Sequence, residues 1–320
     1  MKSSSALFPV SLLRADLVAE KFIEDTYLLK PNNSNDNSVQ IAVTRLGFLD
    51  NENTNNESRG IPVVLLHGSF SNRGFWFSGG GKGFAKSLLE AGFDPWMVEA
   101  RGHGDSPINQ QYRDNNIENY SQFDLPAVQE FILEQTKQKA FWVGHSLGGV
   151  TIATALAGGH LIQTNILGIV LFGAQVSRYP VALKIPGVRL LAKLVLSTKQ
   201  RISGKNIGPE QEPVGIGKEI IRWAGLLTGW RPKKGKPYWQ GLQKLNVPAL
   251  AFGAKKDKAD PAKHCQKLIK AISNDSQFYL LSKERGFTQD YNHVNMVVSK
   301  PAEKEVWPKA IEWMNLTFNQ

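Results

Sequence analysis

The sequence contains a single cysteine, Cys265, which excludes an internal disulfide and a CxxC metal site. Nothing therefore requires an oxidising compartment, and structural zinc is not expected. The sequence also lacks an uninterrupted apolar run of about 18 residues, the length that a membrane-spanning helix needs. A short apolar run near the N-terminus is interrupted by Pro9 and ended by Arg14 and Asp16, and no small-residue cleavage site follows it. We therefore expect neither a signal peptide nor a transmembrane helix, and we predict a cytoplasmic protein.

Acidic residues are the scarcer charged type, with 28 Asp and Glu against 38 Lys and Arg and a formal net charge of +10. An excess of this size raises nucleic acid, an anionic membrane surface and an acidic substrate as partners. Hydrophobic residues make up 42% and charged residues 21% of the 320-residue chain. This composition is typical of a globular protein and excludes collagen-like, coiled-coil and low-complexity classes.

Strand-like and helix-like segments alternate along most of the chain. Buried-strand patterns occur at Pro62–Leu66, Phe93–Val98, Ala140–Val143, Asn165–Phe172, Val247–Phe252 and Gln277–Leu281. Helical patterns occur at Gly83–Ala91, Gln122–Gln138, Val150–Ala157, Ala262–Ile272 and within Ala302–Phe318. The earlier segment Ser38–Phe48, between two Asn-rich turns, is predicted to be a strand pair at a sheet edge. The order predicts an α/β fold with a mainly parallel sheet between helices, in which ligands bind at the carboxyl ends of the strands.

A serine flanked by glycines follows one of these strands. The stretch Gly144–Gly149 (GHSLGG) lies between the strand AFWV and the helix VTIATALA. This arrangement is a nucleophile elbow: the serine, Ser146, sits on a tight and strained turn, and a Cβ at either flanking glycine would collide with neighbouring backbone. The turn exposes Oγ and points the next amide, that of Leu147, at the same space from a helix N-terminus.

Three motifs in this order resemble the α/β-hydrolase superfamily, specifically its lipase- and esterase-like serine hydrolases of the AB hydrolase-1 type. They are Leu66–Ser69 (LHGS), Arg101–Ser106 (RGHGDS) and Gly144–Gly149. With the acid and histidine described below, the resemblance covers roughly residues 39–318. It implies an α/β-hydrolase fold, with a mostly parallel sheet of the eight-stranded type flanked by helices and an inserted helical cap or lid.

The resemblance also assigns roles to the motifs. In this superfamily the loop after His-Gly supplies the second oxyanion donor, which falls on the backbone N–H of Ser69, with Phe70 as the neighbour to check. The amide of Leu147 is the first donor. The histidines of the motifs, His67 and His145, are expected to be structural. So are three residues of the RGHGDS stretch, which are His103, Asp105 and Ser106.

A serine nucleophile needs a histidine base and a carboxylate that orients it, and the superfamily order is serine, acid, histidine. Four of the six histidines come too early in the chain: His67, His103, His145 and His160. His264 lies within a predicted helix and is expected at the surface. His293 lies in a polar loop after the last predicted strand, where the family places its base, and is therefore the predicted base.

Two aspartates follow the strand that ends near Gly253. The family usually has the acid four residues before a proline, which fits Asp257 and Pro261. Asp260 remains the alternative acid and is otherwise expected to cap the following helix. One departure is that Gly253 lies four residues before Asp257, where three is more usual. Phe172–Gln175, where some relatives place the acid, has no carboxylate, so Asp257 is preferred.

The identity of Ser146 separates this chain from sibling enzymes that use Asp or Cys at the elbow, and Cys265 is too distant to replace it. The resemblance therefore implies cleavage of carboxylic esters, with lipid acyl esters among the candidates, through an acyl-enzyme and without a metal or organic cofactor. Other activities use the same triad: acyltransferase, thioesterase, haloperoxidase-like and hydroxynitrile lyase reactions. A non-catalytic binding protein on the same fold is the alternative of a different class.

The interval 177–245 is far longer than an ordinary α/β connection and predicts a cap or lid over the site. We therefore divide the chain into an N-terminal extension (1–37), a hydrolase core (38–176 and 246–320) and this cap. The cap contains 14 Lys and Arg but only 3 acids, a net charge of +11, whereas the remainder has a net charge of −1. The excess positive charge of the chain therefore lies in the cap.

Two stretches of the cap, Val188–Ser197 and Lys218–Trp230, look amphipathic, and three tryptophans lie in it, Trp223, Trp230 and Trp239. Two interpretations stay open. The apolar faces pack on the core while the lysines are solvated. Alternatively the cap is a mobile lid with an apolar inner face for an acyl chain and a basic outer face for an anionic membrane. The basic run at 231–236 contains Pro and Gly, which disfavours a nucleic-acid patch.

Overall fold

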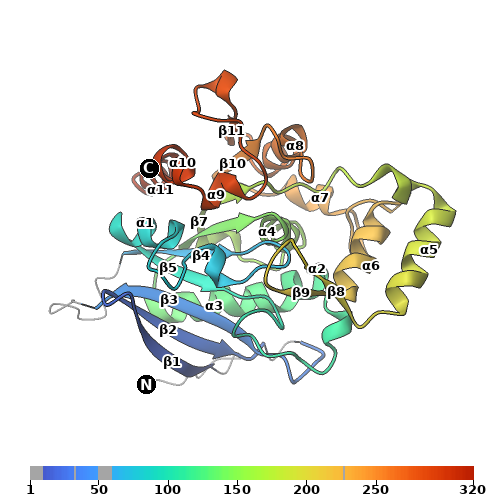
Figure 1. Cartoon of the computed structure of the whole chain (residues 1–320), viewed down its shortest axis with the longest axis horizontal. Coiled ribbons are helices and arrows are strands. Elements are labelled where there is room, and N and C mark those ends of the chain that lie inside the picture. Colours follow the sequence, from blue (N-terminus) through green and yellow to red (C-terminus); the bar gives the residue numbers. More distant parts are fainter. Residues whose placement is uncertain (1–9, 32–33, 50–59, 226–227) are drawn as a thin grey trace.

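The structure is a computed structural model that describes residues 10–31, 34–49, 60–225 and 228–320. Four of the sequence predictions fall partly or wholly outside these ranges. They are the first nine residues of the signal-peptide assessment, residues 32–33 of the first Asn-rich turn, the whole second Asn-rich turn (50–58), and residues 226–227 of the amphipathic stretch Lys218–Trp230. Within them, nine strands form one sheet in the order β1-β2-β3-β5-β4-β6-β7-β10-β11 (Figure 1). The strands are β1 (Val10–Val18), β2 (Phe22–Leu29), β3 (Ile41–Phe48), β4 (Ile61–Leu66), β5 (Phe93–Val98), β6 (Ala140–His145), β7 (Ile166–Phe172), β10 (Ala249–Ala254) and β11 (Gln277–Leu281).

The strands from β5 to β11 pair in parallel, whereas β1, β2 and β3 pair antiparallel with their neighbours. The central strands are apolar on both faces, as parallel strands between two helix layers must be. Along β4, Val63 and Leu65 pack into one core cluster, while Val64 and Leu66 pack into the cluster on the opposite face. This two-sided burial explains why the central strands are continuous apolar runs in the sequence.

Helices cover both faces of the sheet. Helices α1 and α11 supply Phe84 and Trp313 to one core cluster, whereas α3, α4 and α8 supply Phe131, Ile152 and Leu268 to the other. The helices of the core are α1 (Phe84–Glu90), α2 (Ile117–Asn119), α3 (Leu125–Thr136), α4 (Leu147–Ala157), α8 (Ala262–Ile272), α9 (Asn295–Val298), α10 (Lys300–Glu305) and α11 (Trp307–Phe318). The α/β architecture with a mostly parallel sheet is confirmed, with nine strands in place of the eight-stranded type.

The N-terminal part of the chain differs from its prediction. Residues 1–37, predicted as an extension, contain β1 and β2, which continue the central sheet. The segment Ser38–Phe48 forms one strand, β3, and not a pair. It lies third from the edge because β1 and β2 are added outside it. The C-terminal helix is also divided, into α10 and α11.

In its described residues, the interval 177–245 contains two short strands and three α-helices between β7 and β10, preceded by a 3-10 helix at Val181–Lys184. They are α5 (Pro186–Ser197), β8 (Arg201–Ser203), β9 (Gln211–Pro213), α6 (Val214–Trp223) and α7 (Tyr238–Leu242). In Figure 1, α5 and α6 lie side by side at the end of the molecule, away from β1. Two of the three tryptophans of this interval, Trp223 and Trp230, are buried in the core cluster that also contains α4. No helix in the described part of the chain combines the length and apolar character that crossing a bilayer requires.

Candidate active site

Ser146 lies on a strained turn between β6 and α4. Its backbone has φ 51° and ψ −118°, a conformation that L-residues rarely adopt, and its N–H donates a 2.9 Å hydrogen bond to the carbonyl of Phe172. The neighbouring glycines make this turn possible. A Cβ on Gly144 would lie 2.5 Å from the backbone nitrogen of Gly149, and one on Gly148 would lie 2.5 Å from the carbonyl oxygen of Leu66. The geometry is that of a nucleophile elbow.

The loop after β4 runs beside this elbow. A Cβ on Gly68 would lie 3.1 Å from Cβ of Ser146, which places the next residue, Ser69, near the nucleophile. His67 holds the loop: its Nε2 accepts a hydrogen bond from the N–H of Ala100, and its Nδ1 lies 2.8 Å from the carbonyl of Gly68. Burial, with the nearby His103, lowers the pKa of His67 to about 3, so this imidazole is neutral and structural.

The two backbone amides predicted as oxyanion donors differ from the amide of Phe70 in whether they already have a hydrogen-bond partner. In the described part of the chain, neither the N–H of Ser69 nor that of Leu147 donates a hydrogen bond to another residue. The N–H of Phe70 instead donates a 2.7 Å hydrogen bond to Oε1 of Glu212, and the carbonyl of Phe70 accepts from the N–H of Glu210. Phe70 has a positive φ of 58°. The amides of Ser69 and Leu147 therefore remain available to a ligand, and that of Phe70 does not.

Glu212 is a functional candidate that the sequence did not single out. It lies on β9, in the interval 177–245, and is only 2% exposed. Its Oε1 also lies 3.4 Å from Nε2 of His103, whereas Oε2 is buried without a hydrogen-bond partner among the described residues. It borders a small cavity of about 40 Å³ that is also lined by Tyr120 and Leu147. The only signal in the sequence was the scarcity of acids in this interval.

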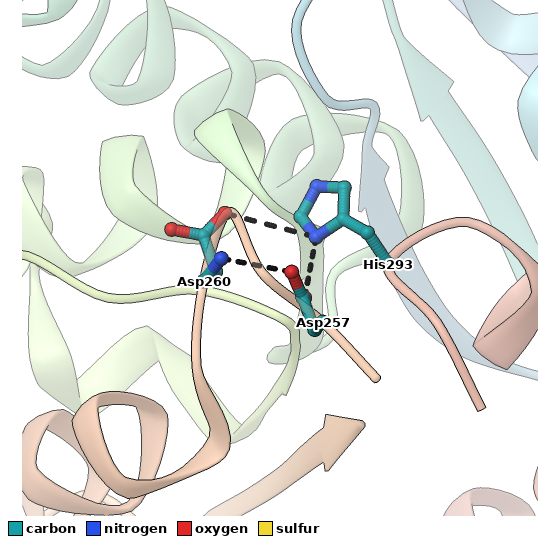
Figure 2. Close-up of side chains that lie close together, drawn as sticks. All are labelled: Asp257, Asp260 and His293. Carbon is teal, nitrogen blue, oxygen red and sulfur yellow. Dashed lines mark hydrogen bonds and ion pairs between the residues drawn. The ribbon is translucent and has the colours of Figure 1, made fainter. Parts of the chain in front are cut away.

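His293 and Asp257 are hydrogen-bonded to each other. Nδ1 of His293 lies 2.6 Å from Oδ2 of Asp257, and the Asp257 side chain is fully buried (Figure 2). The other carboxylate oxygen of Asp257 accepts from the N–H groups of Ala259 and Asp260, which fixes its orientation. Burial lowers the pKa of His293, but the hydrogen bond and charge of Asp257 outweigh it, so the pKa is raised.

Asp260 lies at the edge of this pair. Its Oδ2 is 3.7 Å from Nδ1 of His293, and its Oδ1 accepts a 2.9 Å hydrogen bond from Gln175. Burial raises the pKa of Asp260 to about 6. The prediction that Asp260 caps the following helix is wrong, because its side chain is bound to Gln175 and makes no cap hydrogen bond to α8. Cys265 is buried and donates to the carbonyl of Asp260.

The described residues show no hydrogen bond between Ser146 and His293. His145, the residue before Ser146, contacts His293 instead. Its Nε2 lies 2.8 Å from the carbonyl oxygen of His293, and the two ring centroids are 4.7 Å apart. Burial lowers the pKa of His145 to about 3, and its ring stacks on Phe75 at 4.4 Å. Catalytic hydrogen bonds are often long before substrate binds, so this geometry leaves Ser146 and His293 as candidates whose roles stay predictions.

Asp257, Asp260 and His293 are also the residues whose ligand atoms, all within 4.8 Å of one another, could surround a metal ion. The atoms of Asp257 and His293 that could bind a metal ion already make hydrogen bonds. Nδ1 of His293 is bound to Asp257, and the second oxygen of Asp257 takes two amide hydrogen bonds. A metal ion would have to break the 2.6 Å contact. The cluster fits an oriented imidazole better than a metal centre.

The remaining predicted residues have structural contacts. Asp105 binds Arg14, and Ser106 donates to the carbonyl of Glu99 and accepts from the N–H of Ala42. His264, expected at the surface, is only partly exposed, and its Nδ1 lies 2.7 Å from Oγ of Ser177. This serine-histidine pair has no carboxylate bound to the other ring nitrogen of His264 among the described hydrogen bonds.

The sheet, its flanking helices and the elbow have the architecture of the α/β-hydrolase fold. A family model described as the alpha/beta hydrolase fold matches residues 61–190. The structure resembles an esterase from Thermogutta terrifontis, with a TM-score of 0.60, 15% identity, and coverage of 89% of this chain and 96% of that one. It also resembles a monoacylglycerol lipase from Paleococcus ferrophilus, with a TM-score of 0.56, 17% identity, and coverage of 81% and 96%.

Lipases are among the proteins whose sequences resemble this chain. The chain is 34% identical over 97 residues to a tear acid lipase-like protein of Mesocricetus auratus, over 28% of this chain and 24% of that protein. It is 30% identical over 117 residues to the gastric triacylglycerol lipase of Homo sapiens, over 34% of this chain and 29% of that protein. The chain therefore spans only about a quarter of the length of the first of these relatives. With the family model over residues 61–190, these matches show that the chain has the α/β-hydrolase fold and resembles lipases over about a third of its length.

Proposed function

We propose that the protein is a serine hydrolase that cleaves carboxylic esters, lipid acyl esters among them. The observation that carries this proposal is the 2.6 Å hydrogen bond between His293 and a fully buried Asp257 carboxylate. The imidazole of His293 packs against His145, the residue that precedes Ser146 on its strained turn. Lipase and esterase relatives support ester hydrolysis in general.

The proposed reaction assigns each of these residues a role. His293 takes the proton of Ser146 as Oγ attacks the ester carbonyl, and Asp257 stabilises the imidazolium that forms. The N–H groups of Ser69 and Leu147 bind the oxyanion of the tetrahedral intermediate. As the intermediate collapses, His293 gives its proton to the leaving alcohol and an acyl-enzyme remains. His293 then activates water, which releases the acid and restores Ser146.

The test is labelling of the folded protein with a fluorophosphonate probe, followed by mapping of the modified residue. We expect the adduct on Ser146, its loss in Ser146→Ala, and a strong reduction in His293→Ala. Ser177→Ala and His264→Ala are matched controls, because these two residues form a serine-histidine contact at 2.7 Å elsewhere in the protein. A folded wild-type protein that takes no label, or takes it at Ser177, would contradict the proposal. An acyl-length series of p-nitrophenyl esters then tests lipid preference, with turnover expected to rise with chain length.

A further inference from the structure

Helix α5 exposes an unusual number of apolar side chains. None of the residues of α5 is buried, and Leu190, Leu191 and Leu194 are 61%, 62% and 57% exposed. The segment before the helix continues this surface, with Val181 75% and Ile185 55% exposed. Contiguous exposed apolar residues of this kind mark a surface that meets another apolar phase.

The packing of α5 leaves this surface free. Its opposite side faces α6, where Leu196 lies against Gly217, since a Cβ on this glycine would come within 2.9 Å of it. Ala192 and Leu196 on that side are partly buried. The helix is therefore apolar on both sides, and packing against α6 accounts for only one of them. In Figure 1, α5 forms the outer boundary of this end of the molecule.

The charges around α5 indicate which kind of partner its exposed apolar surface would bind. All three acids of residues 177–245 turn inward: Glu210 binds Asn72 and Gly104, Glu212 binds Phe70, and Glu219 binds the N–H of Ile117. Five basic residues close to α5 in the chain are exposed: Lys184, Lys193, Lys199, Arg201 and Lys205. The described part of this interval therefore has no exposed carboxylate, and its outer surface is basic.

We infer that α5 and residues 181–185 form an interfacial anchor that docks the protein on an anionic lipid bilayer. The exposed leucines enter the boundary between headgroups and acyl chains, and the lysines reach the lipid phosphates with their alkyl stems along the apolar surface. A second copy of the chain would bring two basic surfaces together, which Coulomb repulsion opposes. A peptide would need a groove, whereas the apolar residues lie on a convex helix. The inference goes beyond the proposed hydrolase activity and does not depend on it.

The experiment is co-sedimentation of the full chain with vesicles of phosphatidylcholine alone and of phosphatidylcholine mixed with phosphatidylglycerol. We expect binding to the mixed vesicles that weakens as salt is added. Replacing Leu190 and Leu194 by Glu should weaken binding at least about tenfold, because two apolar side chains no longer enter the interface. Leu316→Glu with Phe318→Glu, on α11 and 58% and 48% exposed, is the matched control with the same change in net charge and should bind as the wild type does.

A second pair of variants tests the charge. Lys184→Glu with Lys193→Glu should abolish the preference for anionic vesicles, whereas Lys300→Glu with Lys304→Glu, exposed residues of α10, should keep it at the same net charge. Ser146→Ala should bind fully, which separates failure of the anchor from failure of the hydrolase proposal. Equal binding to both vesicle types, or no binding by the folded wild type, would overturn the inference. So would a wild-type dimer that the Leu190 and Leu194 changes dissociate.

Discussion

The imidazole of His293 is subject to opposing influences. Burial lowers its pKa, while the hydrogen bond and charge of Asp257, together with the charge of Asp260, raise it further than burial lowers it. A general base works only in its neutral form. We therefore expect kcat/KM for a p-nitrophenyl ester to rise with pH through an apparent pKa above about 6.5, the ordinary value for histidine. An acidic limb that ends well below that value would contradict the assignment of His293 as the base.

The two aspartates beside His293 should give different phenotypes. Asp257→Asn removes the acceptor that lies 2.6 Å from Nδ1, and we expect kcat to fall by about 10⁴-fold, since the imidazole loses its orientation and its counter-charge. Asp260→Asn removes only a carboxylate at 3.7 Å. It should keep most of the activity and shift the acidic limb of the pH profile to lower pH, because one charge that raises the His293 pKa is gone.

The measurement is the pH profile of kcat/KM for both variants and the wild type. The reverse ranking of kcat would assign the acid role to Asp260. Equal loss in both variants would show that the two carboxylates act as one unit.

Strand β9 links the interval 177–245, through Glu212, to the loop after β4 that is predicted to supply an oxyanion donor. Its carboxylate accepts the N–H of Phe70, the residue next to Ser69, at 2.7 Å. Glu212→Ala removes this acceptor, and the loop should lose its position. We expect kcat to fall by about 10- to 100-fold, the cost of misplacing an oxyanion donor by a fraction of an ångström to an ångström. Glu212→Gln keeps an oxygen at this position and should restore most of the activity.

Steady-state kinetics and the rate of fluorophosphonate labelling measure this effect. Glu212 contacts no reacting atom. Recovery of turnover in Glu212→Gln, which lacks the negative charge, is therefore the result that distinguishes a positioning role from a charge effect. Wild-type turnover in the Ala variant would rule out the role.

The elements differ in how well the sequence predicts them, and the reason lies in what each strand buries. Strands such as β4 and β6 are buried on both faces and are mainly apolar runs, so their predicted bounds lie within one or two residues of the observed ones. In β2 the buried positions include Glu24 and Thr26, which disguise its alternation. Thr26 is satisfied by Thr44 of β3 at 2.9 Å, a partner that only the folded sheet supplies.

The same distinction applies to the candidate site. The elbow can be predicted from local sequence, because Gly144–Gly149 fits one short motif. The strained backbone that this motif predicts is found at Ser146, which has a positive φ. The contact of Glu212 with Phe70 joins residues 142 positions apart and has no local signature. The sequence also does not predict that α5 is exposed. An apolar helical pattern predicts burial, and only the fold shows which side of the helix lacks a packing partner.

Considered as a whole, the molecule ties its N-terminal strands to the site through Arg73. The N–H of Arg73 donates to Glu99, and its guanidinium binds Glu24 of β2 and Asp105 of the RGHGDS turn. Asp105 in turn binds Arg14 of β1. Strands predicted as a separate extension therefore support the loop that follows Ser69.

This network predicts how stability depends on pH when the arginine is removed. Glu24 is 2% exposed, and burial raises its pKa although Arg73 lowers it. In Arg73→Ala the burial remains without the counter-charge, so the pKa of Glu24 rises further. A carboxyl group whose folded pKa exceeds its unfolded value is penalised only where it is ionised. The deficit relative to the wild type should therefore be small at pH 5 and grow to about 2–3 kcal/mol at pH 8.

Thermal unfolding of the wild type and of Arg73→Ala across this pH range measures the deficit. Adding Glu24→Gln to Arg73→Ala should restore stability at pH 8, since the buried charge is then absent, and should make the deficit independent of pH. A stability deficit that shrinks as the pH rises, or that Glu24→Gln does not relieve, would contradict this role of Glu24. It would mean that Arg73 acts through Asp105 instead. In that case Asp105→Asn, added to Arg73→Ala, should restore stability.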